Sequence, residues 1–287
     1  MYTVYHHTDW HRQIAERLVA FLNDRGIDAE SKLVDTIDPD GNGEKPTGMV
    51  VTVIRSDGRF WAIDFKDTMN PKRNYVVREW IMSPKCVSVL KAQYRMNYYT
   101  QEVYDKLNPY TYFEKDPARF QRERNMFTGV ERTERSLYFR GQPWGFRVKV
   151  LRHLDDVLVP QRKKKLRMSL YFDECAKYKV GLALPGFGNA CHREIEYMGM
   201  GIPVIMPVLK TSFHDPLIPG VHYFGVPVNT SDSNSEEIAD KIRQKYLEII
   251  DDDDKLAKVA HNATEWYERN VLFPNSIELT ARIMGII

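Results

Sequence analysis

The chain has 287 residues, 43% of them hydrophobic, which is enough for a large core and for about one to two domains. Its 41 Lys and Arg residues nearly balance its 39 Asp and Glu residues. The resulting net charge of +2 argues against a nucleic-acid-binding protein, which would usually carry a one-sided basic excess. The three cysteines include no CxxC pair, which argues against a disulfide framework and favours a reducing compartment.

The sequence gives two indications of where the protein resides. No apolar run approaches the roughly 18 residues that a membrane-spanning helix needs. The first residues also lack the basic-then-apolar pattern of a signal peptide. We therefore expect a soluble, cytoplasmic protein without a membrane span.

The first half of the chain predicts one helix and one pair of strands. Residues 9–25 place apolar side chains on one face at helical spacing, and a glycine follows as a stop signal. Two β-favouring runs, 49–54 and 60–65, flank a Ser-Asp-Gly turn and are expected to pair. Residues 70–128 are rich in Tyr and Arg and are interrupted by prolines, so we expect this region to be irregular.

The second half alternates short apolar strands with helices. We expect strands at 136–139, 179–184, 202–206 and 221–224, and helices at about 145–155, 167–176, 190–200, 234–250, 253–269 and 275–286. This alternation is typical of a parallel sheet covered by helices on both faces, and so predicts an α/β fold. In such sheets ligands bind outside the carboxyl ends of the strands, which directs attention to the segments that follow the strands.

Two arginines and a glycine follow the first of these strands. Arg140 and Gly141 come directly after it, and Arg147 lies in the first turns of the next helix. Guanidinium groups bind phosphate oxygens in a bidentate manner, and a helix N-terminus supplies free N–H groups and partial positive charge. These residues therefore predict a diphosphate site. The alternative is that Gly141 only permits a turn and that the arginines pair with surface acids.

A glycine-rich turn follows the second strand and leads into a helix. Its residues Gly186, Gly188 and Asn189 allow the backbone to approach a ligand closely. No Walker lysine is present, which argues against a P-loop NTPase.

Three charged residues lie in the helix that this turn opens. Arg193 falls in the first helical turn and is expected to face the same edge of the sheet as Arg140. Either Glu194 or Glu196 can accept hydrogen bonds from ribose hydroxyls, and the alternative for Glu196 is an exposed helix charge.

A carboxylate at a strand end in the first half is a candidate general base. It is Asp67, in the segment Asp64-Phe-Lys-Asp67. The alternative is an ordinary aspartate at a strand end. No DxD motif follows a strand in the second half, so we expect no metal ion there.

Five segments of the second half, taken in order, resemble the protein O-glucosyltransferase and capsule-associated xylosyltransferase family, and more loosely the exostosins. They are Leu-Tyr-Phe-Arg-Gly at 137–141, Lys-Tyr-Lys-Val-Gly-Leu at 177–182, Gly-Phe-Gly-Asn-Ala-Cys-His-Arg at 186–193, Gly-Ile-Pro-Val-Ile at 201–205, and Val-His-Tyr-Phe-Gly-Val-Pro-Val at 221–228. The resemblance covers about residues 137–287. It implies a GT-B-like fold of two Rossmann-type lobes, with a reduced acceptor-side lobe at 1–130 and a donor-binding lobe at 131–287.

The resemblance also implies an activity. The family's reaction is an inverting, metal-independent transfer of a sugar, with xylose or glucose favoured, from a UDP-sugar to a hydroxyl of a glycan or glycoprotein. By position, Arg140 and Gly141 match the family's donor-side residues, and Arg193 matches the arginine that neutralises the diphosphate. Asp67 resembles the proposed base. The alternative function is a non-catalytic nucleotide- or glycan-binding module derived from such a transferase.

Overall fold

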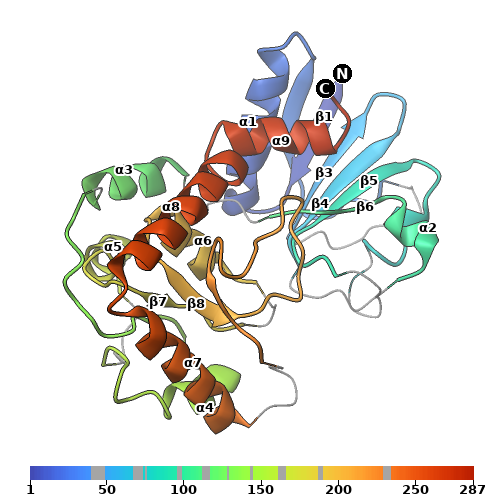
Figure 1. Ribbon diagram of the computed structural model, residues 1–287. Coiled ribbons are helices and arrows are strands. Elements are labelled where there is room, and N and C mark those ends of the chain that lie inside the picture. The colour runs from blue at the N-terminus through green and yellow to red at the C-terminus, as the bar shows by residue number, and fades with distance from the viewer. Residues whose placement is uncertain are drawn as a thin grey trace. The chain divides into compact units, whose positions relative to one another are not determined.

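The chain forms a mixed α/β structure, as predicted (Figure 1). The computed structural model describes residues 1–39, 49–66, 74, 76–95, 99–111, 117–127, 129–142, 145–160, 166–186, 190–228 and 234–287. Within these residues, no helix is both long enough and apolar enough to cross a lipid bilayer.

The chain divides into two compact units. Unit 1 comprises residues 1–117, 211–216 and 270–287, and unit 2 comprises residues 118–210 and 217–269. The bounds of the two units differ from those of the predicted lobes. Unit 2 begins at residue 118 rather than 131, and residues 211–216 and the last helix belong to unit 1 rather than to the second lobe.

Unit 1 is built on a six-stranded sheet in the order β2-β1-β3-β4-β5-β6. The strands are β1 (Tyr2–His6), β2 (Ala29–Leu33), β3 (Val50–Arg55), β4 (Phe60–Asp64), β5 (Cys86–Lys91) and β6 (Leu107–Pro109). β3 runs antiparallel to its neighbours β1 and β4, which confirms the predicted pairing of β3 with β4. The remaining pairs are parallel, so the other five strands have their carboxyl ends at one edge of the sheet.

Helices of unit 1 pack against this sheet and against one another. They are α1 (Asp9–Asn23), α2 (Gln101–Tyr104), α9 (Asn275–Ile283) and the short 3-10 helix Trp80–Met82. The helix α1 contacts β1, β2 and α9 with its buried apolar face. Two side chains of the sheet region hold the C-terminal segment: Trp61 Nε1 donates to the Met284 carbonyl oxygen at 2.6 Å, and the Tyr110 hydroxyl bonds that of Thr280 at 2.5 Å.

Unit 2 contains a parallel sheet in the order β7-β8-β9. Its strands are β7 (Gly181–Leu182), β8 (Val204–Pro207) and β9 (Phe224–Val226). The strand predicted at 136–139 is present only as isolated parallel bridges, of which one joins Tyr138 to Gly181. That bridge places residue 140 at the carboxyl end of β7, as the sequence predicted.

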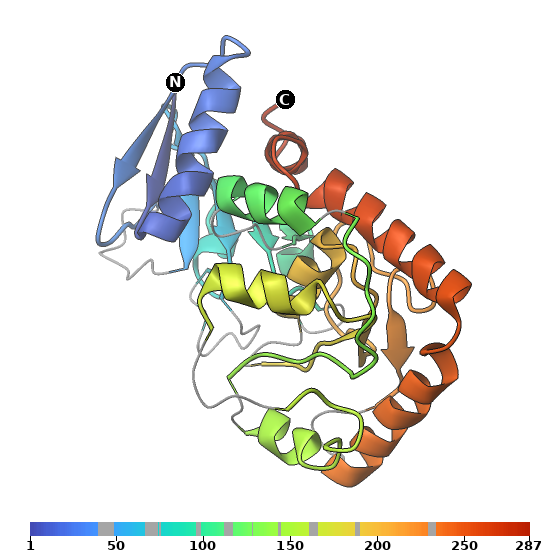
Figure 2. The same cartoon turned by 90° about the vertical axis from the view of Figure 1, so that its left-hand side faces the viewer.

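Helices of unit 2 pack against this sheet and against one another. They are α3 (Pro117–Phe127), α4 (Phe146–Leu151), α5 (Met168–Cys175), α6 (His192–Gly199), α7 (Ser235–Ile249) and α8 (Asp253–Asn270). The helices α6 and α7 contact the strands of this sheet. Along α7, Ile238, Ile242 and Ile249 recur at helical spacing and are fully buried in the core of the unit. In Figure 2 the short yellow-green helix α4 lies beside the orange helix α7, and these two helices are in contact.

Candidate functional site

Arg193 is the central residue of the candidate site in unit 2. It lies in the first turn of α6, and its Nε donates to the backbone carbonyl oxygen of Arg140 at 2.8 Å. The guanidinium group lies over the ring of Phe139, with Cζ 4.5 Å from the ring centroid. In the described part of the chain, Nη1 of Arg193 is buried and has no hydrogen-bond partner. An unsatisfied buried donor costs about 1–3 kcal/mol, so this nitrogen is a candidate binding group for an anion.

Gly141 makes room for this guanidinium group. A Cβ atom at residue 141 would lie 2.0 Å from Nη2 and 2.8 Å from Cζ of Arg193. Such distances are far shorter than van der Waals contact, so any side chain at 141 would displace Arg193. The sequence predicts that Gly141 lies near the donor or in a turn, and the close approach of Arg193 is a steric reason for a glycine at this position.

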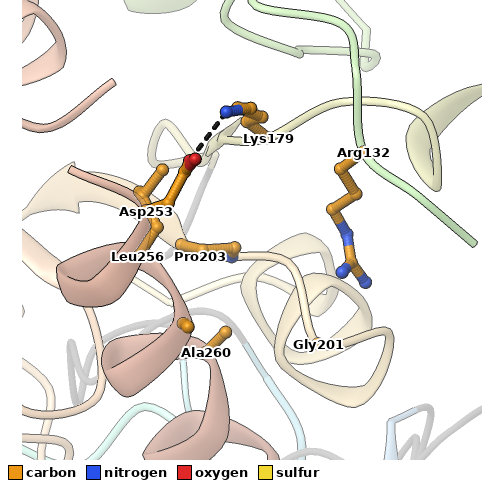
Figure 3. A pocket seen from close by; sticks show the side chains of 8 residues that line it. Arg132, Lys179, Gly201, Pro203, Asp253, Leu256 and Ala260 are labelled. Carbon is orange, nitrogen blue, oxygen red and sulfur yellow. Dashed lines mark hydrogen bonds and ion pairs between the residues drawn. The ribbon is translucent and has the colours of Figure 1, made fainter. Parts of the chain in front are cut away.

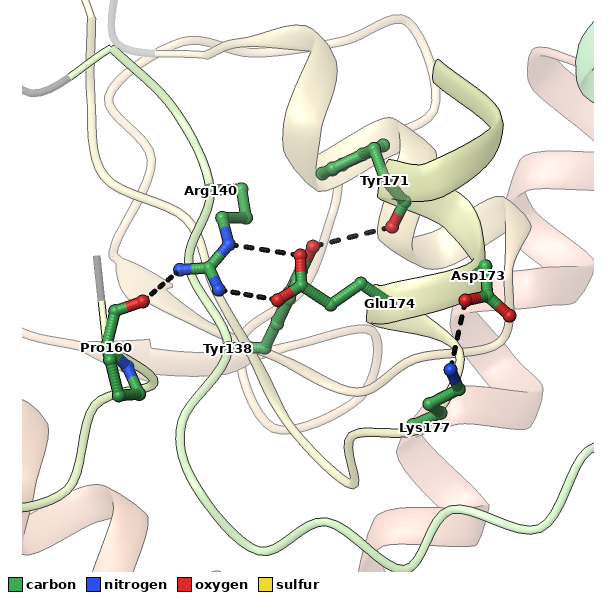
Figure 4. A network of polar contacts seen from close by, with 7 residues as sticks. All are labelled: Tyr138, Arg140, Pro160, Tyr171, Asp173, Glu174 and Lys177. Carbon is green, nitrogen blue, oxygen red and sulfur yellow. Dashed lines mark hydrogen bonds and ion pairs between the residues drawn. The ribbon is translucent and has the colours of Figure 1, made fainter. Parts of the chain in front are cut away.

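Arg140 does not present a free guanidinium group beside Arg193. Its Nε and Nη2 donate to the two carboxylate oxygens of Glu174 at 3.2 and 2.5 Å, and Nη1 donates to the Pro160 carbonyl oxygen at 2.7 Å (Figure 4). The two side chains of this ion pair are only 10% and 15% exposed. The geometry therefore agrees with the alternative reading of the sequence for this residue, in which an arginine pairs with an acid.

The buried side chain of Arg147 binds backbone carbonyl groups of the segment that follows β7. Its Nε and Nη2 donate to the Leu184 carbonyl oxygen at 3.1 and 2.9 Å, and Nε also donates to the Pro185 carbonyl oxygen at 3.0 Å. The residue is 7% exposed, and burial, together with the nearby charge of Arg193, lowers the pKa of its guanidinium group. A Cβ atom at Gly186 would lie 3.0 Å from Nη2 of Arg147, so Gly186 allows this close approach.

The two glutamates of α6 have different surroundings. The buried carboxylate of Glu194 accepts a hydrogen bond from the backbone N–H of Cys191 and so caps the helix. Burial raises the pKa of Glu194 to about 7, although backbone N–H groups and the charges of Arg193 and Arg147 act in the opposite direction. Glu196 is partly buried, and its Oε2 accepts a hydrogen bond from the Tyr171 hydroxyl at 3.0 Å.

Three predicted site residues, Asp67, Gly188 and Asn189, lie outside the described residues. In unit 1, the structure instead shows a buried charge at Asp64, the last residue of β4. Its Oδ2 lies 3.4 Å from Nζ of Lys91 and accepts a hydrogen bond from Asn74 Nδ2 at 2.6 Å. Both charged side chains are fully buried.

The sequence reasoning missed Lys91 because its segment was expected to be irregular, which is wrong for β5. Asp64 and Lys91 are paired residues in the register of the parallel strands β4 and β5. Lys91 would therefore have been found from the sequence only if β5 had been predicted as a strand next to β4. Across the described residues, no group of three or more His, Cys, Asp and Glu side chains is arranged to hold a metal ion.

No protein-family model matches this sequence, and a search of curated proteins found no similar chain. The function is therefore inferred from the geometry around Arg193 and from the order of the motifs in the second half.

Proposed function

We propose that the protein is a metal-independent, inverting glycosyltransferase of GT-B type. It transfers a sugar, with xylose or glucose favoured, from a UDP-sugar to a hydroxyl of a glycan or glycoprotein. The donor binds unit 2 beyond the carboxyl ends of its strands. The observation that carries this proposal is the buried, unpartnered Nη1 of Arg193 at the N-terminus of α6.

In this proposal Arg193 neutralises the diphosphate of the donor. As the bond between the anomeric carbon and the diphosphate oxygen breaks, negative charge builds on the departing UDP. A fixed guanidinium group and the N–H groups at a helix N-terminus stabilise that charge without needing to reorganise. The acceptor oxygen forms the new bond to the anomeric carbon from the opposite face, and its proton passes to Asp67, the base that the family resemblance implies.

The remaining residues position Arg193 rather than bind phosphate through their side chains. Arg140 holds Nε of Arg193 through its carbonyl oxygen, and the ion pair with Glu174 fixes the Arg140 side chain. Arg147 holds the carbonyl groups of Leu184 and Pro185, just before the glycine turn. The sequence predicted that the guanidinium groups of Arg140 and Arg193 both bind the diphosphate. In this proposal only that of Arg193 does so.

The second candidate function is a non-catalytic nucleotide-binding module. The observation that favours it is the ion pair of Arg140 with Glu174, which leaves one unpaired guanidinium group where the sequence predicted two. Such a site suits binding of UDP, but provides less stabilisation for a leaving group during turnover.

A two-part experiment tests the proposal. Thermal unfolding is measured with UDP, UDP-xylose, UDP-glucose, GDP and ADP, because a ligand at about 100 times its Kd stabilises the folded state by about 2.7 kcal/mol. Release of UDP from each UDP-sugar is then followed with and without glycan acceptors. Stabilisation by uridine ligands together with UDP release supports a transferase, and stabilisation without release supports the binding module. If no uridine ligand stabilises the protein, both are wrong.

A further inference from the structure

Unit 2 has a pocket near the amino ends of β7 and β8, where the sheet is farthest from Arg193. Its volume is about 160 Å³ (Figure 3). Four parts of the chain line this pocket. They are the segment after α3 with Arg132, the segment before β7 with Lys179, the turn before β8 with Pro203, and the helix α8 with Asp253, Leu256 and Ala260.

Arg132 brings an uncompensated charge to this pocket. Its Nη2 donates to the carbonyl oxygen of Met200 at 2.7 Å and so caps the C-terminal end of α6. Its Nε is buried and has no hydrogen-bond partner, and within the described residues no carboxylate forms an ion pair with Arg132. A partly buried guanidinium group that has no counter-ion, and whose Nε has no acceptor, is costly, so its place on the wall of a pocket points to a ligand that supplies the missing acceptor.

The rest of the pocket limits the charge and character of that ligand. Lys179 is already neutralised, since its Nζ lies 2.7 Å from Oδ1 of Asp253. Figure 3 shows this pair facing the pocket from the side opposite Arg132. The net charge of the three residues is therefore +1, which matches a monoanion better than a phosphate dianion. Carbon atoms of Pro203, Leu256 and Ala260 provide an apolar wall.

We propose that this pocket binds a short aliphatic carboxylate. The carboxylate group accepts a hydrogen bond from Nε of Arg132, and the alkyl chain lies against Leu256 and Ala260. A charge-assisted bond of this kind is about twice as strong as a neutral one, and burial of the alkyl carbons adds to the affinity. The site is separate from the proposed donor site and does not depend on the transferase proposal.

Calorimetric titration with butyrate tests this site, with butyramide as the neutral isostere and inorganic phosphate as the dianion. We expect butyrate to bind at least about tenfold more tightly than butyramide, because only the carboxylate compensates the guanidinium charge. Arg132→Gln should lower butyrate affinity by about tenfold or more. Ala260→Leu fills the pocket while leaving the Arg132 bond to Met200 in place, and should also abolish binding.

Arg135→Gln is the matched control, because Arg135 is an exposed neighbour in sequence whose guanidinium group pairs with Asp251 outside the pocket. It should bind butyrate as the wild type does. The proposal is overturned if butyrate does not bind the wild type, if phosphate binds more tightly than butyrate, or if Ala260→Leu keeps the wild-type affinity. Circular dichroism of Arg132→Gln checks that the variant remains folded without this helix cap.

Discussion

Buried charges are treated differently in the two compact units. In unit 1, Asp64 and Lys91 are fully buried at the ends of paired parallel strands and compensate each other. In unit 2, Arg193 and Arg132 each have a buried nitrogen that lacks a hydrogen-bond partner among the residues that the structure describes. Because a buried polar group without a partner is costly, we propose that the nitrogens of unit 2 bind ligands, whereas the charges of unit 1 stabilise the fold.

The buried pair of unit 1 should give the largest effect on stability. Asp64→Ala removes the carboxylate that lies beside the buried ammonium group of Lys91, and we expect it to lower the free energy of unfolding by about 3–5 kcal/mol. Urea denaturation followed by circular dichroism measures this loss. The control is Asp251→Ala, which removes an exposed carboxylate and should cost about 0–1 kcal/mol. Equal losses in the two variants would contradict the assignment of Asp64 as a structural charge.

The Arg140–Glu174 pair gives the next largest effect. Arg140→Gln leaves the partly buried Glu174 without its charged partner, and should cost about 1.5–3 kcal/mol in the same denaturation experiment. Since the carbonyl oxygen of residue 140 remains in place for Arg193, UDP affinity should fall less than in Arg193→Gln. If Arg140→Gln loses more UDP affinity than Arg193→Gln, Arg140 binds phosphate, as the sequence predicted.

Gly141→Ala should act through Arg193. The added Cβ would lie 2.0 Å from Nη2, so the guanidinium group must move, at a cost of about 1–3 kcal/mol in stability and with loss of UDP binding. A double-mutant cycle with Arg193→Ala measures the coupling between the two positions. If the cost of Gly141→Ala stays the same when Arg193 is already shortened, steric conflict with Arg193 is not its cause.

The pH dependence of Glu194 is the smallest predicted effect. Burial raises its pKa from 4.5 to about 7 in the folded protein, so the folded state binds the proton more tightly than the unfolded state. Its contribution to stability is therefore fully present below pH 4.5 and is lost as the pH rises through 7.

Glu194→Gln isolates this contribution, because glutamine also caps a helix. Urea denaturation at pH 6 and at pH 8 should show that the wild type loses about 1 kcal/mol more than the variant between the two values. Identical pH profiles for the two proteins would show that Glu194 does not titrate in this range.

Helices and strands were predicted correctly where their apolar side chains recur at helical or strand spacing. The helix α1, the β3–β4 hairpin and the helices α5–α9 all form within a few residues of their predicted bounds. The strand β2 was missed because its Ala-Glu-Ser-Lys-Leu segment is an edge strand with mostly polar side chains, and β5 because the prolines around it suggested an irregular region.

Part of the candidate site also followed from the sequence. Strand-end positions correctly brought Arg140, Gly141 and Arg193 together, because parallel strands share a carboxyl edge. The pairing of Arg140 with Glu174 could not be predicted, since it depends on how α5 is rotated about its axis. The role of Arg147 as an internal brace was missed for a similar reason, because its carbonyl partners are backbone groups that leave no sequence signal.

The most direct test of the central claim is the dissociation constant of UDP, measured by calorimetry for the wild type, Arg193→Gln and the control Arg135→Gln. If the unpartnered buried nitrogen of Arg193 awaits a diphosphate, Arg193→Gln should weaken UDP binding by about tenfold or more, and Arg135→Gln should leave it unchanged. UDP binding of equal strength in all three proteins would contradict the account.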